Sequence, residues 1–124
     1  NSLESKIKEK PLMREEVLFF LKEKVSYVHN NYEKKGVYLI KNEQTDKVCI
    51  SIGNLYDRNE QEISLVHEVC HAIYGAYGWI YNPCQNDIED LIETESRRFY
   101  DENKGFVQEI YSKLVDKKIH PKDL

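Results

Sequence analysis

Residues 64–72 read SLVHEVCHA and lie in a run whose apolar residues recur every three or four positions. This spacing predicts an amphipathic helix with one buried face. The expected face consists of Ile63, Val66, Cys70, Ile73 and Tyr77. Four residues advance a helix by about 400°, so His67 and His71 project from the same side and can reach one cation. Glu68 is turned about 100° from His67, where it can meet a water molecule on that cation.

The segments before this helix predict strands and a further helix. Apolar residues at helical spacing predict a helix over 13–33, and Gly36 follows at the position of a C-terminal cap. The stretches GVYLI (36–40) and KVCISI (47–52) are rich in β-branched and aromatic residues, and the polar stretch KNEQTD lies between them. They predict two strands of a β-hairpin.

The segments after the helix predict a loop and two more helices. Gly75, Gly78 and Pro83 predict a loop of about ten residues. Asp87 is the expected cap of a helix whose apolar stripe includes Ile92. A break at 103–105 precedes an amphipathic final helix that ends before Pro121. The order α-β-β-α-α-α indicates an α+β fold in one domain, with residues 1–12 as a loosely ordered charged leader.

Composition limits the classes of function. The 124 residues are 40% hydrophobic and 32% charged, which is typical of a soluble globular domain. The net charge is −4 and basic residues form no stripe, so we expect no direct nucleic-acid partner. No apolar run approaches the roughly 18 residues of a membrane span. Three cysteines without C-x-x-C spacing favour a reducing compartment, and we expect a cytoplasmic protein. A chain that begins at Asn1 instead of methionine is expected to be trimmed or a fragment.

A catalytic zinc site needs one more protein ligand than the two histidines. Such sites normally hold three protein ligands and keep a fourth position for water, whose pKa the metal lowers to about 7. The stretch IEDLIETESRRFY (88–100) is acidic and lies at a suitable distance. Glu93 is the first choice, because the small Ser96 one turn on would let this helix approach the metal closely.

Other donors remain open as the third ligand. Glu89 and Glu95 are alternatives, and Cys84 in the preceding loop is a soft ligand more typical of closed structural sites. Glu95 falls on the apolar face of its helix, so it needs a partner such as Arg98 or a histidine. Asp87, Asp90 and Glu95 are also candidates for acceptors that orient the imidazoles.

The two motifs together resemble a known family. HEVCHA (67–72) followed by ETESRRF (93–99) is similar to the patterns H-E-x-x-H and E-x-x-A-x-x-F of ImmA/IrrE-like peptidases, which belong to the gluzincin type of zincin metallopeptidases. Small zincin-like proteins of phages and mobile elements share this pattern. The resemblance covers residues 36–100 and implies a zincin-like fold. It implies that His67, His71 and Glu93 bind Zn²⁺ and that Glu68 is the general base.

The resemblance also implies a substrate and shows departures. The substrate would be a protein or peptide, such as a transcriptional repressor, bound in extended form along the strand nearest the motif helix. That strand would be GVYLI or KVCISIG. Ser96 and Arg97 stand where alanine and a small polar residue are usual, and Tyr100 stands where alanine is frequent. SprT-like zincins share the H-E-x-C-H-A motif, but this sequence has no downstream histidine-glycine pair of the kind that supplies their third ligand. The rival hypothesis is a zincin-like module that binds a protein partner without cleaving it.

Overall fold

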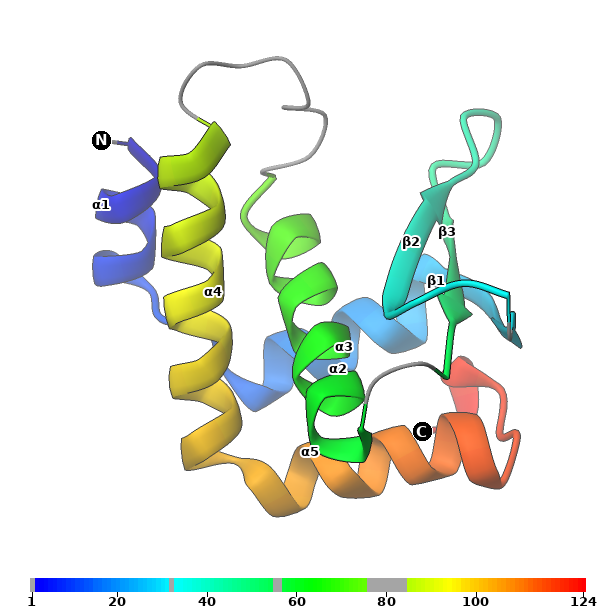
Figure 1. The fold of residues 1–124 in the computed structure, drawn as a ribbon. Coiled ribbons are helices and arrows are strands. Elements are labelled where there is room, and N and C mark those ends of the chain that lie inside the picture. Colours follow the sequence, from blue (N-terminus) through cyan, green and yellow to red (C-terminus); the bar gives the residue numbers. More distant parts are fainter. Residues whose placement is uncertain (1, 32, 55–56, 76–84) are drawn as a thin grey trace.

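The computed structural model describes residues 2–31, 33–54, 57–75 and 85–124, and within these the chain forms five α-helices and a three-stranded sheet (Figure 1). The elements are α1 (Ser2–Glu9), α2 (Arg14–Lys24), β1 (Val25–Asn30), β2 (Val37–Lys41), β3 (Val48–Ile52), α3 (Arg58–Ile73), α4 (Gln85–Glu102) and α5 (Lys104–Tyr111), followed by a π-helical turn (Ser112–Asp116) and a 3₁₀ turn (Pro121–Asp123). The α+β prediction is confirmed. Most of the predicted loop after Gly75, including Cys84, lies outside the described residues.

The sheet has the strand order β1-β3-β2. β2 and β3 are antiparallel, with Val37 opposite Ile52 and Lys41 opposite Val48, so the predicted hairpin is confirmed. β1 pairs in parallel with the other side of β3. β3 is therefore the central strand, while β2 is an edge strand.

The predicted helix over 13–33 is wrong beyond Lys24. Residues 25–30 form β1, along which burial alternates from one residue to the next. Val25 and Val28 fit the helical spacing of the preceding residues, but short apolar runs of this kind fit either period. Two valines and a tyrosine suit a pleated surface, and the ladder with β3 gives their main-chain groups partners.

The charged leader is more ordered than expected, because residues 2–9 form α1. Leu3 and Ile7 are one helical turn apart, and both pack against the core. Lys8 and Glu4 form an ion pair with a distance of 3.2 Å on the outer side of the helix. In Figure 1, α1 lies beside α4, so the leader covers part of the apolar face of that helix.

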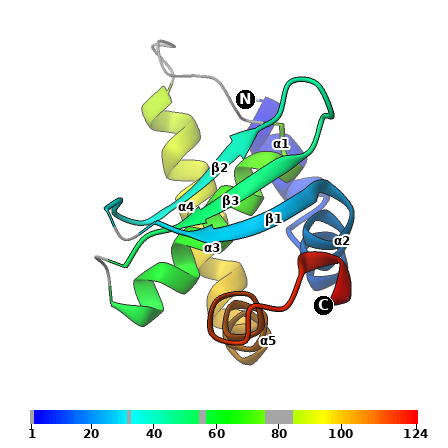
Figure 2. The same ribbon diagram turned by 90° about the vertical axis from the view of Figure 1, so that its right-hand side faces the viewer.

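α3 is the central helix of the fold and carries the HEVCH motif. Asp57 caps its N-terminus, since its side chain accepts a hydrogen bond from the backbone nitrogen of Glu60 at 3.0 Å. Val66 and Cys70 are buried, so the predicted structural role of this thiol is confirmed, and burial raises the pKa of Cys70 to about 12. In Figure 2 the sheet lies in front of the helices, which cover only one of its faces.

α4 packs along α3 through a small buried residue. Ser96 is fully buried, and its hydroxyl donates a 2.7 Å hydrogen bond to the carbonyl of Ile92 one turn earlier. The helix begins at Gln85, so Asp87 lies inside its first turn and is not the predicted cap. A carboxylate in this turn still complements the helix dipole. Among the described residues, no helix is both long and apolar enough to cross a bilayer.

Candidate metal centre

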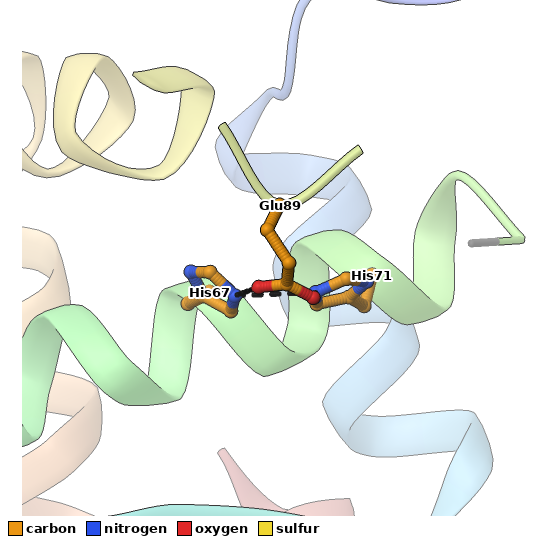
Figure 3. A group of neighbouring side chains, drawn as sticks. All are labelled: His67, His71 and Glu89. Carbon is orange, nitrogen blue, oxygen red and sulfur yellow. Dashed lines mark hydrogen bonds and ion pairs between the residues drawn. The ribbon is translucent and has the colours of Figure 1, made fainter. Parts of the chain in front are cut away.

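His67 and His71 of α3 meet Glu89 of α4 in one compact cluster. Their Nε2 atoms are 3.1 Å apart, and the two carboxylate oxygens of Glu89 lie 3.0 Å from His67 Nε2 and 2.9 Å from His71 Nε2. Figure 3 shows the carboxylate of Glu89 between the two rings, with one oxygen facing each. One donor atom from each residue lies within 4.8 Å of the other two, so the group could hold a metal ion.

The donor set and its spacing fit zinc. Zinc takes imidazole nitrogen and carboxylate oxygen at about 2.0–2.2 Å, and tetrahedral angles then place the donor atoms roughly 3.4 Å apart. The two imidazole nitrogens lie 3.1 Å apart, and each lies 2.9 or 3.0 Å from a different oxygen of Glu89, which is somewhat closer than this. A metal ion would therefore require small shifts of these side chains, most readily of Glu89, whose side chain is 44% exposed.

Glu93, the first choice from sequence, contacts the other nitrogen of His67. Its Oε2 lies 2.8 Å from His67 Nδ1, while its Oε1 lies 2.6 Å from Arg97 Nε. An ionised carboxylate only accepts hydrogen bonds, so Glu93 favours the tautomer of His67 that carries its hydrogen on Nδ1. The structure thus places Glu89, an alternative left open by the sequence, among the three donors. Glu93 is placed where partners of metal-bound histidines lie.

This arrangement explains why the cluster suits a cation. With its hydrogen on Nδ1, His67 presents a lone pair at Nε2 toward the carboxylate of Glu89. Lone pairs that face one another at hydrogen-bond distance need a shared proton or a metal ion between them. His71 is 7% exposed, so this donor is largely shielded from water.

Glu95 is not part of this cluster, although it remained an alternative ligand from sequence. It is 5% exposed, and its Oε2 accepts a 2.7 Å hydrogen bond from the backbone nitrogen of Leu12. Arg98 donates to both of its oxygens at 2.7 and 2.8 Å, so the expected pairing with Arg98 is confirmed. The other two proposed acceptors, Asp87 and Asp90, are exposed.

Glu68 lines the same cleft as His67, His71 and Glu89. The cleft has a volume of about 420 Å³ and is also lined by Gly36, Val37 and Tyr38 at the start of β2. Burial raises the pKa of Glu68 to about 7, an effect opposed by His67 and reinforced by the negative charge of Glu89. A carboxylate beside a metal position in a cleft of this kind can exchange a proton with water or substrate.

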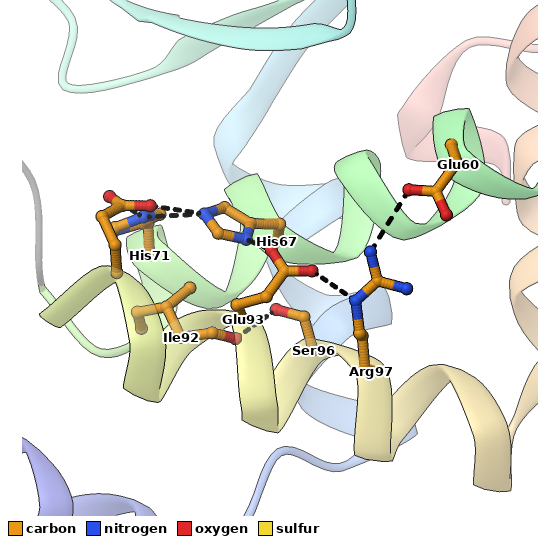
Figure 4. Close-up of polar contacts among 8 residues, drawn as sticks. Glu60, His67, His71, Ile92, Glu93, Ser96 and Arg97 are labelled. Carbon is orange, nitrogen blue, oxygen red and sulfur yellow. Dashed lines mark hydrogen bonds and ion pairs between the residues drawn. The ribbon is translucent and has the colours of Figure 1, made fainter. Parts of the chain in front are cut away.

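Sequence reasoning did not assign a role to Arg97 or Glu60. Arg97 Nη2 lies 3.3 Å from Glu60 Oε2, so the guanidinium connects Glu93 on its own helix to the first turn of α3 (Figure 4). The spacing of Glu93 and Arg97 is a helical i,i+4 pair, which the sequence does show. The contact with Glu60 depends on how α3 and α4 pack, which the sequence does not show.

Comparison with known proteins gives no relative for this chain. No family model, no curated protein and no solved structure matches it. The function therefore has to be argued from the cluster and the cleft.

Proposed function

We propose that the chain is a zinc-dependent peptidase in which His67, His71 and Glu89 hold the metal and Glu68 is the general base. The observation that carries the proposal is the convergence of three metal-binding side chains in a cleft that Glu68 also lines. The order of the HEVCH motif and the later glutamate resembles that of gluzincins, which supports the same class. Glu89 takes the place that the resemblance gave to Glu93.

The residues divide the chemistry between them. A zinc ion supplies a Lewis acid that polarises the scissile carbonyl and makes water a better nucleophile at neutral pH. Glu68 accepts the proton of the attacking water and then donates it to the leaving amine. Glu93 holds the hydrogen of His67 at Nδ1, which directs the Nε2 lone pair toward the metal position.

An extended peptide is the substrate that the cleft favours. Of the two strands that the sequence left open for pairing with a peptide, β3 (KVCISIG) is excluded, because it has a neighbouring strand on both sides. β2 (GVYLI) is an edge strand, and Val37 and Tyr38 line the cleft together with the two histidines. A peptide that added a strand to β2 would form main-chain hydrogen bonds there and pass the cluster.

A single substitution tests the enzyme. Glu68→Gln should retain zinc and lower hydrolysis of a mixed peptide library by roughly 10²- to 10⁴-fold, the contribution of a general base. Zinc content is measured by atomic emission and cleavage by mass spectrometry. Wild-type cleavage rates in a zinc-loaded Glu68→Gln protein would contradict the role of this residue.

A protein-binding module without turnover is the second candidate. It is favoured by the exposed apolar side chains on the outer face of the sheet, since Tyr27, Tyr38 and Ile40 are 54%, 42% and 56% exposed. Such a module would bind its partner equally well with Glu68→Gln and release no cleaved product. Specific hydrolysis by the pure protein that is lost in Glu68→Gln would reject this candidate.

A further inference from the structure

The polar contacts around His67 continue beyond Glu93 to a side chain that touches neither the metal position nor a histidine. Arg97 Nε donates to Glu93 Oε1 at 2.6 Å, and the Nη2 atom of the same guanidinium lies 3.3 Å from Glu60 Oε2. Figure 4 shows the sequence of contacts from His67 through Glu93 and Arg97 to Glu60. Each member contacts the next, and the two ends lie on α3 while the two middle members lie on α4.

A free glutamate on a helix surface could not orient His67 reliably. The side chain of Glu93 is 41% exposed, so water competes for its oxygens and its rotamers are not restricted by packing. Arg97 fixes one oxygen of this carboxylate and thereby leaves the other directed at His67 Nδ1. Glu60 restrains Arg97 in turn, because it accepts from a second nitrogen of the same planar guanidinium.

We propose that Arg97 is a positioning residue, which holds Glu93 so that His67 keeps its hydrogen on Nδ1 and presents Nε2 to the metal. The inference rests on the proposed metal centre and adds a residue that has no ligand role in it. It also gives a function to one of the departures from the ImmA/IrrE-like pattern, in which a small polar residue is usual at this place.

Because Arg97 and Glu60 are exposed, a positioning role of Arg97 can be distinguished from a contribution to the stability of the fold. The side chains of Arg97 and Glu60 are 50% and 43% exposed, and ion pairs this exposed contribute little to stability. Removing Arg97 should therefore leave the melting temperature nearly unchanged. A purely structural residue would show the opposite behaviour.

The adjacent Arg98 provides a matched control. It is the same residue type on the same helix, but it donates to the buried Glu95 and to the carbonyl of Leu12, away from the metal position. Arg98→Gln should lower the melting temperature and leave the zinc affinity of the folded protein unchanged. Arg97→Gln should do the reverse.

The test measures zinc affinity by competition with a chelator, and the position of the hydrogen on His67 by ¹⁵N chemical shifts in metal-free protein. We expect Arg97→Gln to bind Zn²⁺ about tenfold more weakly, at the lower end of the range for partners of metal-bound histidines. We also expect its His67 shifts to move toward a mixture of the two tautomers. Arg97→Lys keeps the positive charge but lacks the planar guanidinium. It should therefore show weaker forms of both changes.

The outcomes distinguish this inference from the proposed function. If wild type and Arg97→Gln bind Zn²⁺ equally and share the same His67 shifts, Arg97 has no positioning role and the metal centre stands without it. A fall in affinity accompanied by a loss of stability like that of Arg98→Gln would also overturn the inference. If wild type binds no Zn²⁺, the proposed function fails, and the shifts of metal-free His67 alone decide whether Arg97 fixes its tautomer.

Discussion

At the scale of single residues, the two nitrogens of His67 have different partners. Nε2 faces Glu89 and His71, whereas Nδ1 lies 2.8 Å from Oε2 of Glu93. Glu89 and Glu93 are one helical turn apart on α4, so both reach the same histidine from the same side. Their spacing in the sequence could not decide which of them completes the metal site, because the choice depends on where α4 lies along α3.

The two glutamates should differ when each is replaced by glutamine. Glu93→Gln removes an outer partner of a ligand, which typically lowers metal affinity by roughly 10- to 100-fold. Glu89→Gln removes a ligand and should lower the zinc affinity by more than that. Chelator competition measures both variants. A larger loss for Glu93→Gln than for Glu89→Gln would show that the sequence-based choice of Glu93 as the third ligand was right.

At the scale of elements, the packing of α4 on α3 places Glu89 beside the two histidines. Ser96 is fully buried in α4, and we expect its small size to let the two helices approach closely. Tyr100, another departure from the ImmA/IrrE-like pattern, also lies at this contact. Tyr100 is 3% exposed and donates a 2.7 Å hydrogen bond to the buried Glu62 of α3, which joins the two helices.

Enlarging Ser96 should separate the two helices and weaken metal binding. Ser96→Leu adds volume to a filled space, which costs about 1–3 kcal/mol of stability. The displacement should move Glu89 away from the histidines and lower the zinc affinity as well. Urea unfolding and chelator competition measure the two effects. Thr94→Leu, at an exposed position of the same helix, is the control and should change neither.

A second prediction concerns the attachment of the N-terminal segment to α4. Glu95→Gln replaces a buried carboxylate that holds both Leu12 and Arg98. The loss of a buried charged partner is usually large, but the side chain of Arg98 is 37% exposed, so we expect a loss of about 2 kcal/mol in the free energy of unfolding. Glu102→Gln removes an exposed partner of the same arginine and should cost at most about 0.5 kcal/mol. Equal losses in urea unfolding would contradict the importance of burial here.

At the scale of the whole molecule, local patterns predicted most elements but not their partners. The hairpin, the motif helix and the later helices follow from hydrophobic periodicity, and the break at Asn103 is where α4 ends. The sequence did not predict β1 and α1, because both are short elements with little periodicity of their own. A six-residue strand and an eight-residue helix are stabilised by contacts distant in sequence, with β3 for β1 and with α4 for α1, and these contacts leave little trace in local periodicity.

Metal binding should stabilise the entire fold, since the donors come from the two helices at its centre. A ligand at 100 times its dissociation constant adds about 2.7 kcal/mol to the free energy of unfolding. For a chain of this size we expect the melting temperature to rise by roughly 10 °C with Zn²⁺ and to fall again with a chelator. Differential scanning fluorimetry measures this change. His71→Ala should show no rise, and a rise equal to that of wild type would place the metal elsewhere.

The most direct test locates the metal by anomalous diffraction at the zinc edge, using crystals grown with Zn²⁺. We expect one strong peak within about 2.0–2.2 Å of His67 Nε2, His71 Nε2 and a carboxylate oxygen of Glu89, with Glu93 still bonded to His67 Nδ1 and an open side toward Glu68. A zinc peak bound by other residues would show that the cluster is not a metal centre. The absence of any peak would show the same, provided that the three side chains lie together in those crystals.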